Sequence, residues 1–293
     1  MGNTLVEALT SVLSQLDSRF EVIVIDDGST DDSLEKLNDL KDRFPILRTK
    51  YLERNPSRTL AETRNISVKE ARGEYCLLHI DCDDVWEPYI LEFVKVFHSI
   101  EELLSEDVLL CGHQVNMGKR EFLLEHGPYK YGHMVEDRDM WYRLGLIGKY
   151  IPIDHVVFRH RMPLSRKQML RKKYLLTGKI LSDEIRAGNH FGFYLTNLWR
   201  DYMKHSLELR IYKVLIYPAC FIRAKLLGSI ENIDQLTSWN EIKERTKEEN
   251  GTVFEIFSKR GSTFDSNILS PQGKWIFGHK AAEKSISDMP QDL

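Results

Sequence analysis

The chain has 293 residues, of which 42% are hydrophobic, with 41 basic and 44 acidic side chains. This composition excludes a disordered protein, because the apolar content is sufficient for a core and the charges nearly cancel. The near-neutral total also argues against a dedicated nucleic-acid-binding protein. The four cysteines lie far apart and form no C-x-x-C pair, which disfavours a disulfide framework and a zinc site and favours reduced cytoplasmic thiols.

The first 160 residues alternate between helical and strand patterns. Helices are predicted at 4–16, 31–42, 58–72 and 87–104, and strands at 21–25, 47–52, 75–80 and 107–111. This alternation predicts an α/β fold with a mostly parallel sheet and helices on both faces. In such sheets, ligands bind at the carboxyl ends of the strands.

The rest of the chain differs in charge and pattern. Residues 165–227 carry a net charge of +9, whereas residues 1–164 carry −9 and residues 228–293 carry −3. The acidic first part suggests carboxylates gathered around a metal or a cationic centre, and the basic part suggests an anionic surface as a partner. The pattern of residues 164–227 predicts a helical extension. The pattern of residues 228–293 predicts a polar tail with a helix at 238–249.

Within this extension, residues 208–227 alternate apolar and basic side chains around Pro218, which is expected to kink or split the helix. One interpretation is a helix packed on the α/β domain. The other is an interfacial helix on anionic lipid. The positive charge of the surrounding segment favours the second interpretation slightly.

Asp26 and Asp27 follow the predicted strand at 21–25 and precede a helix. A turn with a helix N-cap explains them without any function, since Asp, Ser and Thr are favoured there. Alternatively, two carboxylates at a strand end accept hydrogen bonds from a nucleobase or a ribose.

Three carboxylates stand within four residues at Asp81, Asp83 and Asp84, directly after a predicted buried strand. Such groups repel one another unless a cation lies between them. Oxygen ligands at this density suit Mg²⁺ or Mn²⁺, which commonly share their ligand shell with phosphate. A solvated acidic turn is the alternative.

A third acidic group, Glu136 and Asp137, opens an apolar helical pattern. Acidic residues at a helix N-terminus are stabilised by the helix dipole, which is a sufficient structural reason for them. The functional alternative is a general base directed at a ligand pocket.

Four blocks in this order resemble the family 2 glycosyltransferases, which have the Rossmann-like GT-A fold. They are EVIVIDDGSTDDS (21–33), ETRNISVKEARGEY (62–75), HIDCDDVWEP (79–88) and VEDRDMWYRL (135–144). The resemblance covers about residues 4–162. It implies a GT-A catalytic domain over residues 1–163, followed by the basic helical extension (164–227) and the polar tail (228–293).

The resemblance also implies roles for individual residues. Asp26 and Asp27 match aspartates that bind the nucleoside of a nucleotide-sugar, and Arg64 matches an Arg-Asn step that lies near the nucleotide. Asp81 and Asp83 match the D-x-D motif, which holds the ribose and a divalent metal, Mn²⁺ or Mg²⁺, on the diphosphate. Asp137 matches the expected catalytic base, with Glu136 beside it.

Two departures from the family pattern stand out. The family places a strand before the helix matched by residues 4–16, so we expect that Met1 is an internal methionine and that the true start lies upstream. The family often has a metal-binding histidine after its last core strand. Arg161 stands at that position here, and His160 is one place away, so no metal role is assigned to His160.

The sequence therefore predicts a metal-assisted, inverting hexosyltransferase that moves a sugar from a nucleotide-sugar to a glycan, lipid-linked or protein acceptor. We expect it to act in cell-surface glycan synthesis, in the cytoplasm or at the cytoplasmic membrane face. One alternative is a nucleotidyltransferase acting on sugar phosphates, although the sequence shows no Gly-rich, basic phosphate loop near its start. The other is a catalytically inactive, membrane-associated scaffold.

Overall fold

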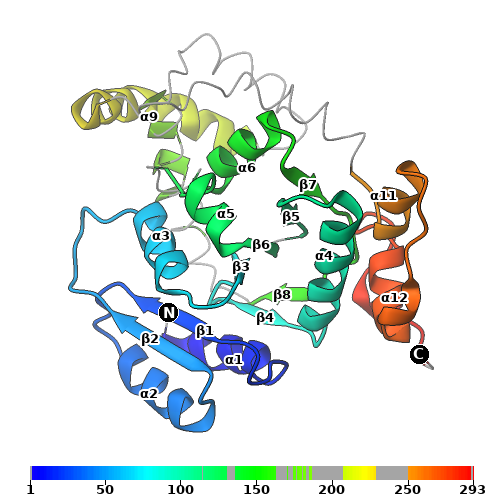
Figure 1. Ribbon diagram of the computed structural model, residues 1–293. Coiled ribbons are helices and arrows are strands. Elements are labelled where there is room, and N and C mark those ends of the chain that lie inside the picture. The colour runs from blue at the N-terminus through cyan, green and yellow to red at the C-terminus, as the bar shows by residue number, and fades with distance from the viewer. Residues whose placement is uncertain are drawn as a thin grey trace.

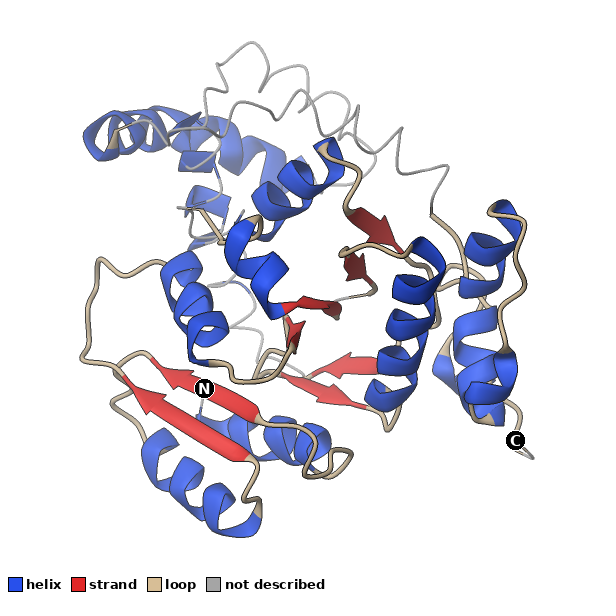
Figure 2. Ribbon diagram, in the orientation of Figure 1, coloured by secondary structure: helices blue, strands red, loops and turns tan. Residues whose placement is uncertain are grey.

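The structure is a computed structural model that describes residues 2–113, 115–130, 136–162, 207–228, 250–291 and 293, with short pieces between 170 and 186. The helix predicted at 238–249 lies outside the described residues, as does most of segment 164–206. The described chain alternates helices and strands, as Figure 2 shows. The predicted α/β class is therefore confirmed.

The first unit is a parallel pair of strands, β1 (Val22–Asp26) and β2 (Leu47–Tyr51). Helices α1 (Gly2–Leu13) and α2 (Ser33–Arg43) lie beside this pair (Figure 1). Leucines at helical spacing form the contact, and the buried set is Leu5, Leu9, Leu13, Leu37, Leu40 and Leu47. This packing fixes the end of β1, where the first aspartate pair stands.

The second unit is a four-stranded sheet in the order β3-β6-β5-β7. Its strands are β3 (Tyr75–Leu78), β5 (Leu109–Cys111), β6 (Asn116–Lys119) and β7 (Tyr150–Pro152). The β5–β7 pair is parallel, whereas β6 runs antiparallel to both of its neighbours. A further antiparallel pair joins β4 (Asp84–Trp86) to β8 (Arg159–Arg161), so strand pairing is mixed among the described residues.

Four helices accompany these strands: α3 (Leu60–Glu70), α4 (Ile90–Leu104), α5 (Arg120–Glu125) and α6 (Glu136–Leu146). The apolar face of α4 is fully buried in the main core, through Ile90, Phe93, Val96, Phe97 and Ile100. Helices α3, α5 and α6 enclose a second apolar cluster. The carboxylates of interest lie in the turn between β3 and β4 and at the start of α6.

The last described residues differ from the polar tail that the sequence predicts. Helices α11 (Val253–Lys259) and α12 (Pro271–Gly278) pack beside α4, as Figure 1 shows. Val253, Ile256 and Phe277 are buried in the same cluster as the α4 residues. Because these apolar residues are spread over two short, capped helices, the average polarity of the segment conceals them.

Backbone hydrogen bonds join this C-terminal segment to the chain after β7. The Asp154 N–H donates to the carbonyl of Gly251 (2.9 Å), and the Val156 N–H donates to that of Ile276 (3.0 Å). Between them, the His155 ring packs on Phe277, with 5.2 Å between ring centroids. The segment is therefore an integral part of the folded core.

We expect folding stability to depend on pH through His155. Burial lowers the pKa of His155 from 6.5 to about 3, so its ring is neutral in the folded chain and charges on unfolding at acidic pH. The unfolded state then binds more protons, and the unfolding free energy decreases by up to about 1.4 kcal/mol per pH unit below pH 6.5. Urea unfolding at pH 7, 6 and 5 measures this slope.

Burial lowers the pKa of His79 to about 3 as well, so both histidines contribute to the slope. The His155→Gln variant should have a smaller slope than the wild-type chain, although it is less stable at pH 7. An unfolding free energy that is the same at pH 7 and pH 5 would contradict this account.

Candidate functional site

The turn after β1 is shaped by Asp26. Its buried Oδ1 accepts N–H bonds from Gly28 (3.1 Å) and Ser29 (2.9 Å). Gly28 has φ +79°, and a Cβ there would lie 2.6 Å from the Cα of Arg54, so only glycine fits this close approach. Asp26 thus orders the loop, and the next carboxylate, Asp27, is left on its outer side.

Asp27 forms an ion pair with Arg58, which precedes helix α3. That helix begins with a capping box, in which Thr59 and Glu62 satisfy each other's backbone N–H groups. The cap fixes the start of α3. One turn later, the helix directs Arg64 toward the acidic residues of the β3–β4 turn and of α6.

Arg64 is supported by Tyr129, which Asn65 holds in place. Asn65 Nδ2 donates to the Tyr129 carbonyl, and Asn65 Oδ1 accepts the Tyr129 N–H, each at 2.7 Å. The Tyr129 ring lies under the Arg64 guanidinium, with 5.6 Å from Cζ to the ring centroid. This cation–π contact restricts where the charge of Arg64 can lie.

His79 stands at the end of β3 with φ +66°, a left-handed conformation that is uncommon for residues with a side chain. Its ring lies between Asn116 and the Tyr129 hydroxyl, with Nδ1 2.5 Å from Asn116 Nδ2 and Nε2 3.0 Å from the hydroxyl oxygen. Because the ring is neutral, Nδ1 accepts from Asn116 and Nε2 donates to Tyr129. The backbone bend at His79 sends the chain into the acidic turn.

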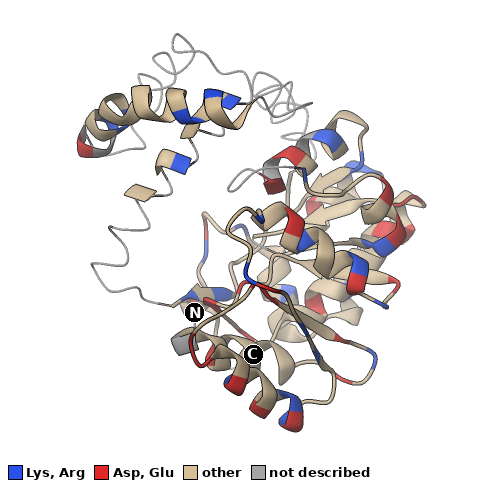
Figure 3. Ribbon diagram, turned by 90° about the vertical axis from the view of Figure 1, so that its left-hand side faces the viewer, with Lys and Arg blue, Asp and Glu red and all other residues tan. Residues whose placement is uncertain are grey.

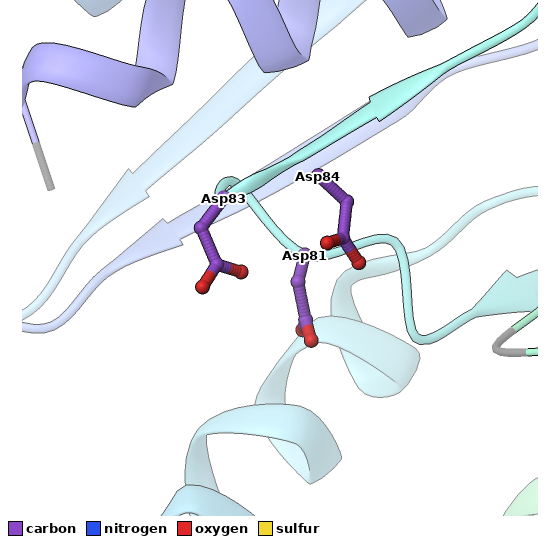
Figure 4. Close-up of side chains that lie close together, drawn as sticks. All are labelled: Asp81, Asp83 and Asp84. Atoms are coloured by element: carbon purple, nitrogen blue, oxygen red, sulfur yellow. The ribbon is translucent and has the colours of Figure 1, made fainter. Parts of the chain in front are cut away.

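The carboxylates of Asp81, Asp83 and Asp84 converge, each with one oxygen within 4.8 Å of the others, and Figure 4 shows them around the turn. Asp84 is fully buried and forms ion pairs with Arg159 (2.6 Å) and Arg161 (3.5 Å) of β8. Those two arginines balance its charge. Asp84 thus has a structural role, and Asp81 and Asp83 are the candidate ligands for a cation.

The donor set of Asp81 and Asp83 fits a hard divalent cation. Burial raises the pKa of Asp81, and repulsion by Asp83 and Asp84 adds to this, while Arg64 opposes it. A carboxylate with a raised pKa lies where additional positive charge would stabilise it. Two carboxylate oxygens leave the other coordination positions to water and phosphate, as is usual for Mg²⁺.

Helix α6 brings the second acidic pair to the same arginine. Arg64 Nη1 lies 2.9 Å from Glu136 Oε1 and 3.9 Å from Asp137 Oδ2, while its Nη2 lies 3.8 Å from Asp81 Oδ1. Glu136 is only 2% exposed. Burial raises its pKa to about 7, with repulsion by Asp137 adding to the shift and Arg64 opposing it. Near neutral pH, Glu136 therefore exists in both protonation states.

The structure thus brings Arg64, Asp81, Glu136 and Asp137 together. Asp83 shares the turn of Asp81, and Asp26 and Asp27 stand at the end of β1. His160 contacts Glu87 instead, at 2.8 Å, and is not part of the Asp81–Asp84 cluster.

Sequence reasoning missed the residues that brace the site, Arg58, Asn65, His79 and Tyr129. Asn65 and His79 had a signal, because each lies within a block quoted for the resemblance. The roles of Arg58 and Tyr129 depend on contacts between segments that are distant in the sequence.

The model of the family described as "Glycosyl transferase family 2" matches residues 2–145. This part of the chain belongs to glycosyltransferase family 2. The matched region contains both acidic groups and Arg64, and it confirms the GT-A type of α/β fold that the resemblance implies.

Several curated glycosyltransferases are similar to part of this chain. The UDP-Glc:alpha-D-GlcNAc-diphosphoundecaprenol beta-1,3-glucosyltransferase WfaP of Escherichia coli is 30% identical over 118 residues, 38% of this chain and 45% of that protein. Glycosyltransferase GlyG of Streptococcus pneumoniae is 31% identical over 37% of this chain and 34% of its own length. The chondroitin synthase of Pasteurella multocida is 31% identical over 39% of this chain and 11% of its own length. The chain spans less than half the length of these relatives.

Two solved structures are more distant. S. aureus TarS, residues 1–349, is 18% identical with a TM-score of 0.46, covering 89% of both chains. Mannosyltransferase PcManGT from Pyrobaculum calidifontis, in complex with GDP-Man and Mn²⁺, is 14% identical with a TM-score of 0.45, covering 85% of this chain and 81% of that one.

The pair of Arg64 and Glu136 should be energetically coupled. Replacing Arg64 by Met leaves the Glu136 carboxylate buried without its counter-ion, so the unfolding free energy should fall by about 3 kcal/mol or more at pH 8. In an Arg64→Met, Glu136→Gln double variant the loss should be at least about 1 kcal/mol smaller than the sum of the single losses. Denaturant unfolding of the four proteins measures the coupling, and additive losses would contradict it.

Proposed function

We propose that the protein is a metal-dependent, inverting glycosyltransferase of the hexosyltransferase type that uses a nucleotide-sugar donor. The observation that carries this proposal is the convergence of Asp81, Glu136 and Asp137 on Arg64, in a chain whose first half matches glycosyltransferase family 2. These side chains combine groups that suit a diphosphate with carboxylates that suit a proton acceptor.

In this proposal, the donor lies along the ends of β1 and β3. Asp26 and Asp27 contact the nucleoside, with Asp26 also holding the loop closed through Gly28 and Ser29. Asp81 contacts the ribose. Arg64 contributes positive charge close to the nucleotide.

Asp81 and Asp83 hold the divalent cation, Mn²⁺ or Mg²⁺. When bound, such an ion neutralises the negative charge that develops on the leaving nucleoside diphosphate. Asp84 supports the turn from behind, because its ion pairs with Arg159 and Arg161 anchor the start of β4 to β8. In this proposal Asp84 stabilises the turn, whereas Asp81 and Asp83 bind the ligand.

Asp137 takes the proton of the acceptor hydroxyl as the hydroxyl oxygen attacks the anomeric carbon. The new bond to this carbon forms while the bond to the diphosphate oxygen breaks, so configuration inverts in one displacement. Glu136 lies beside the base at the start of α6. With a pKa of about 7, it can exchange a proton at working pH.

The metal carboxylates provide the first test. We expect Asp83→Ala to abolish Mn²⁺-dependent hydrolysis of a responsive sugar nucleotide, because one of the two carboxylate ligands is removed. Product release measured with purified protein reports this loss. Asp42→Ala, which changes an exposed carboxylate of α2, is the matched control and should retain hydrolysis. Wild-type protein that hydrolyses no sugar nucleotide would favour the scaffold.

The base provides the second test. The Asp137→Ala variant should bind the donor with nearly unchanged affinity but lose transfer to an acceptor by at least about 100-fold, the range for loss of a general base. Donor binding by calorimetry and transfer by product analysis separate the two effects. If transfer persists, Asp137 is not the base.

The acceptor and the location extend the same proposal. We propose a glycan, lipid-linked or protein acceptor and a role in cell-surface glycan synthesis in the cytoplasm or at the cytoplasmic face of the membrane. WfaP, named for a diphosphoundecaprenol-linked acceptor, and chondroitin synthase, named for a glycan product, support this range.

Helix α9 (Leu207–Leu227) supports a membrane contact. Five exposed residues, four of them large and apolar, recur at spacings of three or four and form one stripe: Ile211, Leu215, Pro218, Ile222 and Leu226. Basic positions lie along the same helix, as Figure 3 shows. The described residues contain no helix with the length and apolarity needed to cross a bilayer. We therefore place this helix on the surface of an anionic bilayer.

Replacing Leu215 and Leu226 by Ser should weaken binding to vesicles that contain anionic lipid, because these side chains are 72% and 83% exposed on the stripe. Co-sedimentation at low salt measures the bound fraction. The matched control is Leu34→Ser with Ile147→Ser, two exposed apolar residues that lie on α2 and directly after α6. Equal binding by both double variants would exclude α9 as the contact.

A further inference from the structure

A recess lies on a face of α3 that Arg64 does not line. Its outer part has a volume of about 480 Å³ and lies between α3, the preceding loop and residues 128–130. Arg58, Asn65, Lys69 and Lys130 contribute polar groups to its lining. This volume falls in the range of small-molecule sites, about 300–1,000 Å³.

The recess continues inward as a second cavity of about 230 Å³. The two parts share lining residues, among them Asn65, Lys69 and Tyr129. The inner part is lined mainly by apolar side chains, namely Val68, Leu78, Leu123, Leu124 and Met140. The recess is therefore amphipathic, with an apolar interior and a polar mouth.

The mouth of the recess carries positive charge. Lys69 and Lys130 have no acidic partner among the described residues, whereas Arg58 is paired with Asp27. The carboxylate in the lining, Glu62, is held by the N-terminal cap of α3, where it accepts the Thr59 N–H at 2.7 Å. Two lysines near an apolar interior suit a ligand that joins an anionic group to an apolar chain.

One residue forms a wall common to the recess and the proposed catalytic site. Tyr129 lines both cavities, while its ring supports the guanidinium of Arg64. Asn65 lines the recess and holds the Tyr129 peptide on both sides. A ligand in the recess would therefore be separated from Arg64 by Tyr129.

We propose that this recess binds the phosphorylated lipid end of the acceptor, with a phosphate or diphosphate at Lys69 and Lys130 and the first part of the apolar chain in the inner cavity. This rests on the proposed function, because it assigns the acceptor class of that site.

Calorimetric titration of the full chain tests the proposal, with EDTA present so that no cation links a diphosphate to Asp81 and Asp83. The probes are farnesyl diphosphate, inorganic pyrophosphate and farnesol. Farnesyl diphosphate should bind at least about tenfold more tightly than either fragment, since only it uses both parts of the recess. Lys69→Gln with Lys130→Gln should weaken this binding at least about tenfold, whereas Lys41→Gln on α2 should leave it unchanged.

Pyrophosphate that binds as tightly as farnesyl diphosphate would overturn the proposal, because the inner cavity would then contribute nothing. The same holds if the double lysine variant binds as well as Lys41→Gln. If the wild-type protein hydrolyses its donor with Mn²⁺ but binds no farnesyl diphosphate, the proposal for the recess is wrong and the proposed transferase function is unaffected. Binding of farnesyl diphosphate without any donor hydrolysis would instead contradict the proposed function.

Discussion

Carboxylates from two distant segments share a single positive charge at this site. The β3–β4 turn supplies Asp81, and the first turn of α6 supplies Glu136 and Asp137, more than fifty residues later in the chain. Their mutual repulsion would separate these segments if Arg64 did not lie between them. The pKa of Glu136 is raised because burial and the charge of Asp137 together disfavour the carboxylate more than Arg64 favours it. This electrostatic balance suits the additional cation that the proposed function requires.

Arg64 can perform this task because its own position is fixed from several sides. The capping box fixes the start of α3, Asn65 holds the Tyr129 peptide, and the Tyr129 ring supports the guanidinium. His79 links that tyrosine to β6 and accepts a left-handed backbone that costs roughly 1 kcal/mol or more. The left-handed backbone at His79 therefore lowers the stability of the fold, but it sets the direction in which the acidic turn leaves β3.

The sequence predicts the parts of this site that follow local rules. Asp81 stands directly after a buried strand and Glu136 at a helix start, and both positions can be inferred from periodicity and a motif. The roles of His79 and Tyr129 depend on contacts between segments about 50 residues apart, which no local pattern encodes. For the same reason, Phe277 could not be assigned to the core in advance, because only the packing of α12 beside α4 buries it.

We propose that Arg64 and the surrounding carboxylates form a metal-dependent nucleotide-sugar site. The most direct measurement is thermal unfolding of the wild-type chain against a panel of sugar nucleotides, each with and without Mn²⁺. A ligand that binds the folded state raises the unfolding temperature in proportion to its affinity and excess. We predict that at least one sugar nucleotide raises this temperature only when Mn²⁺ is present, and that Asp83→Ala abolishes the increase. A panel without any stabilising member, or an increase that is the same without metal, would contradict the account.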